Sequence, residues 1–287
     1  MYDDEYFEHG GAWVCGFWEG SYVANEAKLR REAKSTLSLL PDGAGLRLLE
    51  IGSAGGFFLD EARAAGFDVK GVELNNTMAE WARSKLNLQV FNGRFEDASF
   101  RPGSFEVIVA QDVLEHVCIP KEFVANVARL LAPGGLFLVR GPLEQSWKES
   151  FFQVLRKVRR RLVVDAAPPY HLQGFVRRSF RDLVESSGLS LTRFEARALA
   201  PRIEVRSLKG AVAGVIELVA FGANVLTARG DFMIGIATRP GAGVNTTDRE
   251  LRIQVVRSEM PVENSSALPD YTRRISDQKD QRTTDRT

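Results

Sequence analysis

The segment Leu48–Ala62, LLEIGSAGGFFLDEA, joins an apolar run to a helical pattern through a short break of small residues. The run Leu46–Ile51 contains no proline and is short enough to be a buried parallel strand. The break, Gly52–Gly56, offers almost no side chain to a core, but it lets a ligand approach the main chain and the free N–H groups of the next helix. The segment therefore favours a nucleotide-like ligand, although a strand, a tight turn and a helix also occur together without one.

Strand-like and helix-like patterns alternate along the chain. The strand-like runs are Leu46–Ile51, Val69–Val72, Leu88–Phe91, Phe105–Ala110 and Leu136–Arg140, and the clearest helical patterns are Thr77–Leu86 and Phe123–Leu131. Such alternation predicts a parallel sheet with helices on both faces, and ligands of these sheets lie at the carboxyl ends of the strands, where the strand order reverses. Gly52–Gly56 is therefore expected at a ligand-binding crevice.

The composition limits the kind of partner. The 287 residues carry a formal net charge of +1, which argues against nucleic acid as the main partner. The two cysteines, Cys15 and Cys118, are far apart and belong to no CxxC pair, so neither a disulfide scaffold nor a zinc ribbon is expected. Acidic residues follow Met1 where a secretory signal would have a basic and then an apolar segment, so we expect a cytoplasmic protein.

A second carboxylate, Glu73, closes the run VKGVEL about twenty residues after Gly52, the separation at which an acid accepts hydrogen bonds from ribose hydroxyls. Solvated carboxylates at strand ends are also common. The glycine spacing G-S-A-G-G differs from the G-x-G-x-x-G pattern of dinucleotide-binding proteins, and the P-loop pattern is absent from the sequence. The chain therefore lacks the spacing that a nicotinamide oxidoreductase needs.

The stretch Glu50–Gly56 resembles the E/D-x-G-x-G-x-G signature of the class I methyltransferases that depend on S-adenosyl-L-methionine (SAM). Glu50 matches the acid, Gly52 and Gly56 match the first and third glycines, and Ala54 stands where the middle glycine usually is. Other segments resemble further landmarks of the family, in the family's order: Phe105–Val117, Val127–Val139, Tyr170–Leu191 and Phe232–Thr238. The chain looks most like the branch that contains ubiquinone-biosynthesis O-methyltransferases and many small-molecule and sugar methyltransferases.

The resemblance implies an α/β fold with a Rossmann-like, doubly wound, mostly parallel seven-stranded sheet and an antiparallel last strand. We expect residues 1–40 to form an aromatic-rich arm and a helix that act as a lid, and residues 41–245 to form the SAM-dependent methyltransferase domain. A helical insertion is expected at about residues 145–165, and residues 246–287 have the polar composition of a disordered tail.

The resemblance also assigns residues to the parts of SAM. Glu73 is expected to bind the ribose. The loop Phe95–Asp97 is expected to flank adenine, although relatives often carry an acid where Arg94 stands. Gln111 is expected to help Glu50 and the adjacent main chain hold the methionine ammonium. The complete set of expected SAM-binding residues is Glu50, Gly52, Ser53, Ala54, Gly56, Glu73, Leu74, Phe95, Glu96, Gln111 and Asp112.

Two histidines are candidates for the general base that a hydroxyl acceptor needs. His116 and His171 both fall in loops that the resemblance places at the open end of the sheet, and His171 is the preferred base. In the ubiquinone-type relatives the comparable loop is implicated in binding magnesium through positions that match Asp112, Glu115 and His116. We expect no metal, with magnesium at these three residues as the alternative, since Glu115 and His116 also suit a role in tying the loop to its helix.

Segments outside the shared core are expected to select the acceptor. Aromatic residues of the arm, among them Trp13 and Trp18, are candidates for the wall of the acceptor pocket. The insertion Gln145–Asp165 has the pattern of a basic amphipathic helix, and Ala211–Leu226 is apolar but too short to span a membrane. Solvated or packed helices are the ordinary explanation of both segments, and a lipid-linked acceptor or membrane docking is the minority alternative.

The sequence thus predicts a SAM-dependent methyltransferase whose small-molecule acceptor offers a hydroxyl oxygen, as in a saccharide or a phenol- or quinone-like compound. Nitrogen and carbon acceptors stay open, because the SAM half of the site does not depend on the acceptor atom. A SAM-binding module that has lost turnover is the alternative from another class, with Ala54 and Arg94 as its first signs.

Overall fold

The computed structural model describes residues 25–144, 172–198, 218–219, 221–224, 226–227 and 229–241. Of the predicted features, the aromatic part of the arm, the insertion Gln145–Asp165, the candidate base His171 and the tail lie outside these residues. None of the described helices is long and apolar enough to cross a membrane.

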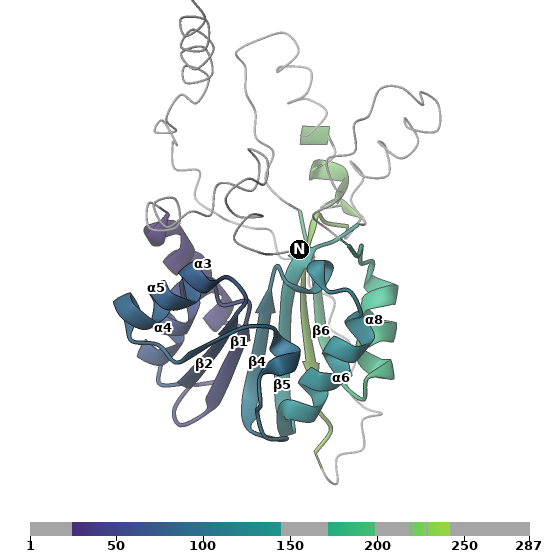
Figure 1. Ribbon diagram of the computed structural model, residues 1–287. Helices are drawn as coiled ribbons and strands as arrows, with labels where there is room; N and C mark the ends of the chain where they lie inside the picture. Colours follow the sequence, from purple (N-terminus) through teal and green to yellow (C-terminus); the bar gives the residue numbers. More distant parts are fainter. Residues whose placement is uncertain are drawn as a thin grey trace, which may run out of the picture. The chain divides into compact units, whose positions relative to one another are not determined.

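A seven-stranded sheet lies at the centre of the described residues (Figure 1). Its strands are β1 (Arg47–Ile51), β2 (Asp68–Glu73), β3 (Val90–Asn92), β4 (Phe105–Gln111), β5 (Leu131–Pro142), β6 (Ser190–Arg197) and β7 (Phe232–Thr238). They lie in the order β3-β2-β1-β4-β5-β7-β6. The first five strands in this order pair in parallel, and β7 is antiparallel to both of its neighbours, β5 and β6. The predicted fold class is confirmed, and the strand order reverses between β1 and β4, where a ligand crevice is expected.

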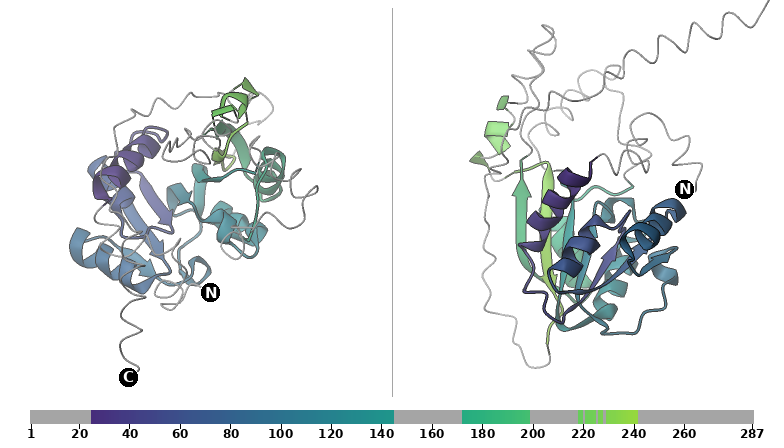
Figure 2. Two further views of the ribbon diagram at one scale, coloured as in Figure 1. Left: turned by 90° about the horizontal axis from the view of Figure 1, so that it is seen from above. Right: turned by 90° about the vertical axis from the view of Figure 1, so that its left-hand side faces the viewer.

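Helices cover both faces of the sheet (Figures 1 and 2). They are α3 (Glu26–Leu37), α4 (Phe57–Ala64), α5 (Asn76–Leu86), α6 (Pro120–Leu130) and α8 (Arg177–Ser186), with short 3-10 turns η2 (Phe95–Asp97) and η3 (Leu114–His116). Because successive strand residues point to opposite faces, Leu48 packs with the α4 and α5 side chains, whereas Leu49 packs with those of α6 and α8. The strands β1, β2, β4, β5 and β7 therefore each contribute to two separate cores.

The strand β5 begins earlier than the expected Leu136. Phe105 of β4 pairs with Leu131, and the register then shifts so that Val107 pairs with Leu136. The glycine pair Gly134–Gly135, which suggests a turn in the sequence, is accommodated inside this irregularity of the strand. β3 begins later than expected, at Val90, and the apolar Leu88 that precedes it is buried in the core on the α4 side of the sheet.

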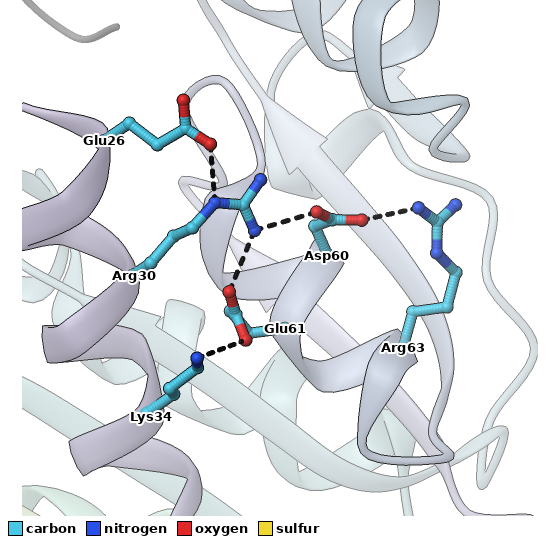
Figure 3. A network of polar contacts seen from close by, with 6 residues as sticks. All are labelled: Glu26, Arg30, Lys34, Asp60, Glu61 and Arg63. Carbon is cyan, nitrogen blue, oxygen red and sulfur yellow. Dashed lines mark hydrogen bonds and ion pairs between the residues drawn. The ribbon is translucent and has the colours of Figure 1, made fainter. Parts of the chain in front are cut away.

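A polar network ties α3 to α4 (Figure 3). The Arg30 guanidinium donates to Asp60 and Glu61 of α4, at 2.9 Å each, and to Glu26 of its own helix at 2.7 Å. Lys34 adds an ion pair with Glu61 at 3.6 Å. These contacts hold α3 beside the helix that follows the glycine-rich turn, with the α3 residue Thr36 fully buried.

Candidate cofactor site

Two glycines shape the turn between β1 and α4. Gly52 has φ +74°, and its amide donates to the Val72 carbonyl of the neighbouring strand at 2.8 Å. Gly56 has φ +87° and stands immediately before α4. A Cβ atom at Gly52 would lie 2.5 Å from Val113 Cγ2, and one at Gly56 would lie 2.5 Å from Leu88 Cδ1. Both positions therefore require glycine for two reasons, backbone conformation and space.

Ala54 occupies the middle of this turn in a conformation that glycine adopts more easily. Its φ of +45° lies in the left-handed region, where an L-residue with a Cβ is strained. Its amide donates to Glu73 Oε2 at 2.7 Å, so the strained residue is held by the carboxylate at the end of β2. The departure from the glycine pattern thus keeps the shape of the turn at a cost in backbone strain.

We expect Ala54→Gly to raise the melting temperature. The substitution relieves about 1–2 kcal/mol of left-handed strain and loses about 0.4–1 kcal/mol through the more flexible unfolded chain. The net gain is up to about 1.6 kcal/mol, and each kcal/mol corresponds to an increase of about 2–4 °C, measurable by circular dichroism or calorimetry. The control Ala128→Gly, inside α6, should lower the melting temperature instead. A lower melting temperature for Ala54→Gly would contradict the strain assigned to this residue.

Glu73 connects the turn to the end of β2. One carboxylate oxygen accepts from the Ala54 amide and the other accepts from the Asn75 amide at 2.8 Å. Burial raises the pKa of Glu73 above its ordinary value, although the backbone hydrogen bonds act in the opposite direction. The next residue, Leu74, has 42% of its surface exposed, an apolar surface beside a carboxylate. Ribose and base need this combination of hydrogen-bond acceptor and apolar contact.

Glu50 and Gln111 meet at the carboxyl ends of β1 and β4, as the sequence predicts. Gln111 Nε2 donates to Glu50 Oε1 at 3.0 Å, while Glu50 Oε2 is buried and has no hydrogen-bond partner among the described residues. Burial is the main cause that raises the pKa of Glu50 to about 8, and the nearby charge of Glu73 adds to it. A buried carboxylate with an unused oxygen suits a cationic ligand group, which would supply the missing donor.

The expected adenine loop, η2, is divided between core and solvent. The Phe95 ring is buried and packs against Phe123 of α6 with 5.2 Å between ring centroids, so only the main chain of Phe95 is left for a ligand. Glu96 and Asp97 are exposed, and Glu96 forms an ion pair with Arg94 at 3.5 Å. Position 94 therefore holds a base that pairs with Glu96, where the resemblance leads us to expect an acid.

The loop after β4 contains the remaining candidates. Asp112 has φ +52°, and its amide donates to the Arg140 carbonyl at 2.9 Å. Glu115 is buried, and its Oε1 lies 3.9 Å from His116 Nε2. Burial raises the pKa of Glu115 to about 7. Within the described part of the chain no group of three His, Cys, Asp or Glu side chains is placed to hold a metal ion, so Asp112, Glu115 and His116 do not fit a magnesium site.

Two further polar residues complete this edge of the sheet, the buried Thr36 and the partly buried Arg140. Arg140 Nη1, at the end of β5, donates to Gln111 Oε1 at 3.1 Å and to Thr36 Oγ1 at 2.7 Å. Thr36 Oγ1 also lies 3.0 Å from Gln111 Oε1. The signal in the sequence is an arginine that closes the apolar run LFLVR, a position comparable to those of Glu50 and Glu73. A basic residue at a strand end belongs to the same pattern as the acids.

Comparison with known proteins agrees with this geometry. The family described as "Methyltransferase domain" matches residues 25–193, more than half of the chain. The chain belongs to the class I SAM-dependent methyltransferases. The matched region of this methyltransferase runs from the residue before α3 into β6, so it includes both strand-end carboxylates and the glycine-rich turn.

Relatives of the methyltransferase include two ubiquinone biosynthesis O-methyltransferases. The one from Caulobacter sp. (strain K31) is 35% identical over 101 residues, which cover 33% of this chain and 40% of the relative. The one from Burkholderia vietnamiensis is 29% identical over 164 residues, which cover 51% of this chain and 69% of the relative. A solved SAM-dependent methyltransferase from Archaeoglobus fulgidus shares the fold, with TM-score 0.53 and 15% identity over 75% of this chain and 94% of that one.

Proposed function

We propose that this methyltransferase binds SAM at the carboxyl ends of β1, β2 and β4 and transfers its methyl group to a hydroxyl oxygen of a small-molecule acceptor. The observation that carries the proposal is the buried Glu50 carboxylate, whose Oε2 has no donor among the described residues. The methionine ammonium of SAM is a cation that would supply this donor. A structural carboxylate would be expected to use both of its oxygens.

Specific residues suit the other parts of SAM. Glu73 already orients the turn through Ala54 and Asn75, and each of its oxygens has a further lone pair for a ribose hydroxyl. Leu74 offers an exposed apolar side chain beside that carboxylate for the adenine. SAM supplies a methyl group on a sulfonium, which is a good leaving group. The chain has to orient the acceptor in line with this bond and exclude water.

The hydroxyl acceptor is inferred from the similarity to relatives named O-methyltransferases. A saccharide and a phenol- or quinone-like compound both suit this chemistry.

His171 stays our prediction for the general base, with His116 as the second candidate. We expect His171→Ala to keep SAM binding and lose methyl transfer, measured with radiolabelled SAM and the acceptor found by screening. Full activity of this variant would mean that the base is another group. Magnesium is not part of the proposal, because Asp112, Glu115 and His116 do not form a metal-binding group.

Calorimetric titration tests the proposed function. The purified full chain is titrated with SAM, S-adenosylhomocysteine and NAD, each with and without magnesium. Saturable binding of both adenosyl compounds, no binding of NAD and no effect of magnesium are expected. A screen of saccharides and phenols with radiolabelled SAM then identifies the acceptor. Failure of both adenosyl compounds to bind would overturn the proposal, whereas binding with no transfer to any acceptor would favour the SAM-binding module without turnover.

A further inference from the structure

Arg140 is a partly buried cation that has fewer partners among the described residues than it can use. A guanidinium has five N–H donors, and the hydrogen bonds that the Arg140 side chain donates to the described residues all come from one nitrogen, Nη1. Its Nε is buried and has no acceptor, and no carboxylate among the described residues lies within ion-pair distance of it. Burial is the main cause that lowers the pKa of this guanidinium below its ordinary value, although the charges of Asp112 and Glu32 act in the opposite direction.

The side chain of Arg140 is fixed in place. Its guanidinium carbon lies 5.2 Å from the centre of the Phe232 ring of β7, while Nη1 is held by Thr36 and Gln111. An arginine held by an aromatic ring and two polar side chains has lost much of its rotamer freedom before any ligand arrives. Binding an anion would therefore cost little additional ordering.

The amide of Gln111 links this cation to the unpartnered carboxylate. Its Nε2 donates to Glu50 and its Oε1 accepts from Arg140, and only this orientation of the amide satisfies both neighbours. Glu50, Gln111 and Arg140 therefore form a row across the ends of β1, β4 and β5, on the face of the sheet that carries Leu48 and Leu138. One end of the row lacks a donor and the other end lacks an acceptor.

A zwitterion is the ligand group that completes both ends of the row. The amino-acid end of SAM carries an ammonium and a carboxylate on the same carbon, so one group can meet both requirements. We propose that Arg140 binds the carboxylate of this amino-acid end while Glu50 binds its ammonium. This inference rests on the proposed function and adds a residue from β5, on the far side of β4 from the glycine-rich turn, to the SAM site.

Three ligands that differ in the charges of their amino-acid end distinguish the binding of the ammonium from the binding of the carboxylate. S-adenosylhomocysteine carries both, decarboxylated S-adenosylhomocysteine keeps only the ammonium, and methylthioadenosine has neither. Each is titrated calorimetrically into the full chain. The unsubstituted protein is expected to bind S-adenosylhomocysteine about 10- to 100-fold more tightly than the decarboxylated compound, the range for a hydrogen-bonded charge pair. Equal affinities would overturn the inference without any variant.

Substitution then assigns the preference to Arg140. Arg140→Met should weaken S-adenosylhomocysteine about 10- to 100-fold and leave the decarboxylated compound and methylthioadenosine unchanged. Arg140→Lys keeps the charge and should retain part of the preference, and it is the variant to rely on if Arg140→Met does not fold. Arg129→Met on α6, whose guanidinium bonds Asn126 of the same helix, is the matched control and should change nothing.

Two results with the variants would contradict the inference. An equal loss for all three ligands would make Arg140 a structural support of the site, and an unchanged preference would mean that another group holds the carboxylate. A different result would overturn the proposed function, namely that the unsubstituted protein binds none of the three ligands.

Discussion

Replacing Glu73 with alanine is expected to weaken the binding of S-adenosylhomocysteine by about 100-fold or more. Two ribose hydroxyls lose a charged acceptor, and hydrogen bonds to charged groups contribute about 1.5–3 kcal/mol each. The substitution also leaves the amides of Ala54 and Asn75 without their acceptor, so the glycine-rich turn loses a support at the same time. Calorimetric titration measures the loss directly.

Two further variants separate these contributions. Glu73→Gln keeps the size of the side chain but removes its charge and one acceptor oxygen, and it should bind with intermediate affinity. Glu106→Ala removes a glutamate that bonds Arg47 at the opposite, amino-terminal end of β4, and it should leave the affinity unchanged. If Glu73→Ala binds S-adenosylhomocysteine as tightly as the unsubstituted protein, the ribose assignment is wrong.

The affinity for S-adenosylhomocysteine is expected to rise with pH, because Glu50 must ionise to bind the ammonium. The pKa of Glu50 in the ligand-free protein is raised to about 8, so the carboxyl is mostly protonated at neutral pH. Below this pKa, each unit of lower pH should weaken binding about tenfold, since binding then requires the release of one proton. The dissociation constant should therefore fall from about pH 6 to about pH 7.5 and level off above the pKa.

One ligand and one variant isolate Glu50 as the cause. Methylthioadenosine has no ammonium, so its affinity should follow pH much less steeply. Glu50→Gln cannot ionise at this position, so the pH dependence of S-adenosylhomocysteine binding should disappear and its affinity should stay low. Parallel pH profiles for the two ligands in the unsubstituted protein would show that Glu50 does not face the ammonium.

The sequence predicts the elements of this fold well where hydrophobic pattern and length agree. The last strand, Phe232–Thr238, has the predicted bounds, and the helix predicted over Thr77–Leu86 begins one residue earlier. The start of β5 was not predicted, because the glycine pair Gly134–Gly135 suggests a turn. A strand can include such residues only when its partner permits a register shift, which the local sequence does not reveal.

The site shows the same limit at the level of side chains. Glu50 and Glu73 stand out in the sequence because a strand-end acid has a recognisable local pattern, and their roles in binding SAM stay predictions. Arg140 was missed because its partners, Gln111 and Thr36, lie 29 and 104 residues away in the sequence. Phe95 was assigned to adenine because of its position in the loop, but its ring serves the core against Phe123. Contacts between distant residues decide both cases.

The attachment of α3 has a consequence for how much of the chain makes a complete binding unit. All residues of the family signature lie from β1 onward, and a shortened chain that begins at β1 would keep every one of them. It would lose Thr36, which orients Arg140 and lies beside Gln111, together with the charged contacts that hold α3 against α4. If Arg140 binds the ligand as proposed, the boundary suggested by the signature falls inside the functional unit, and the helix that precedes the signature supports the binding site.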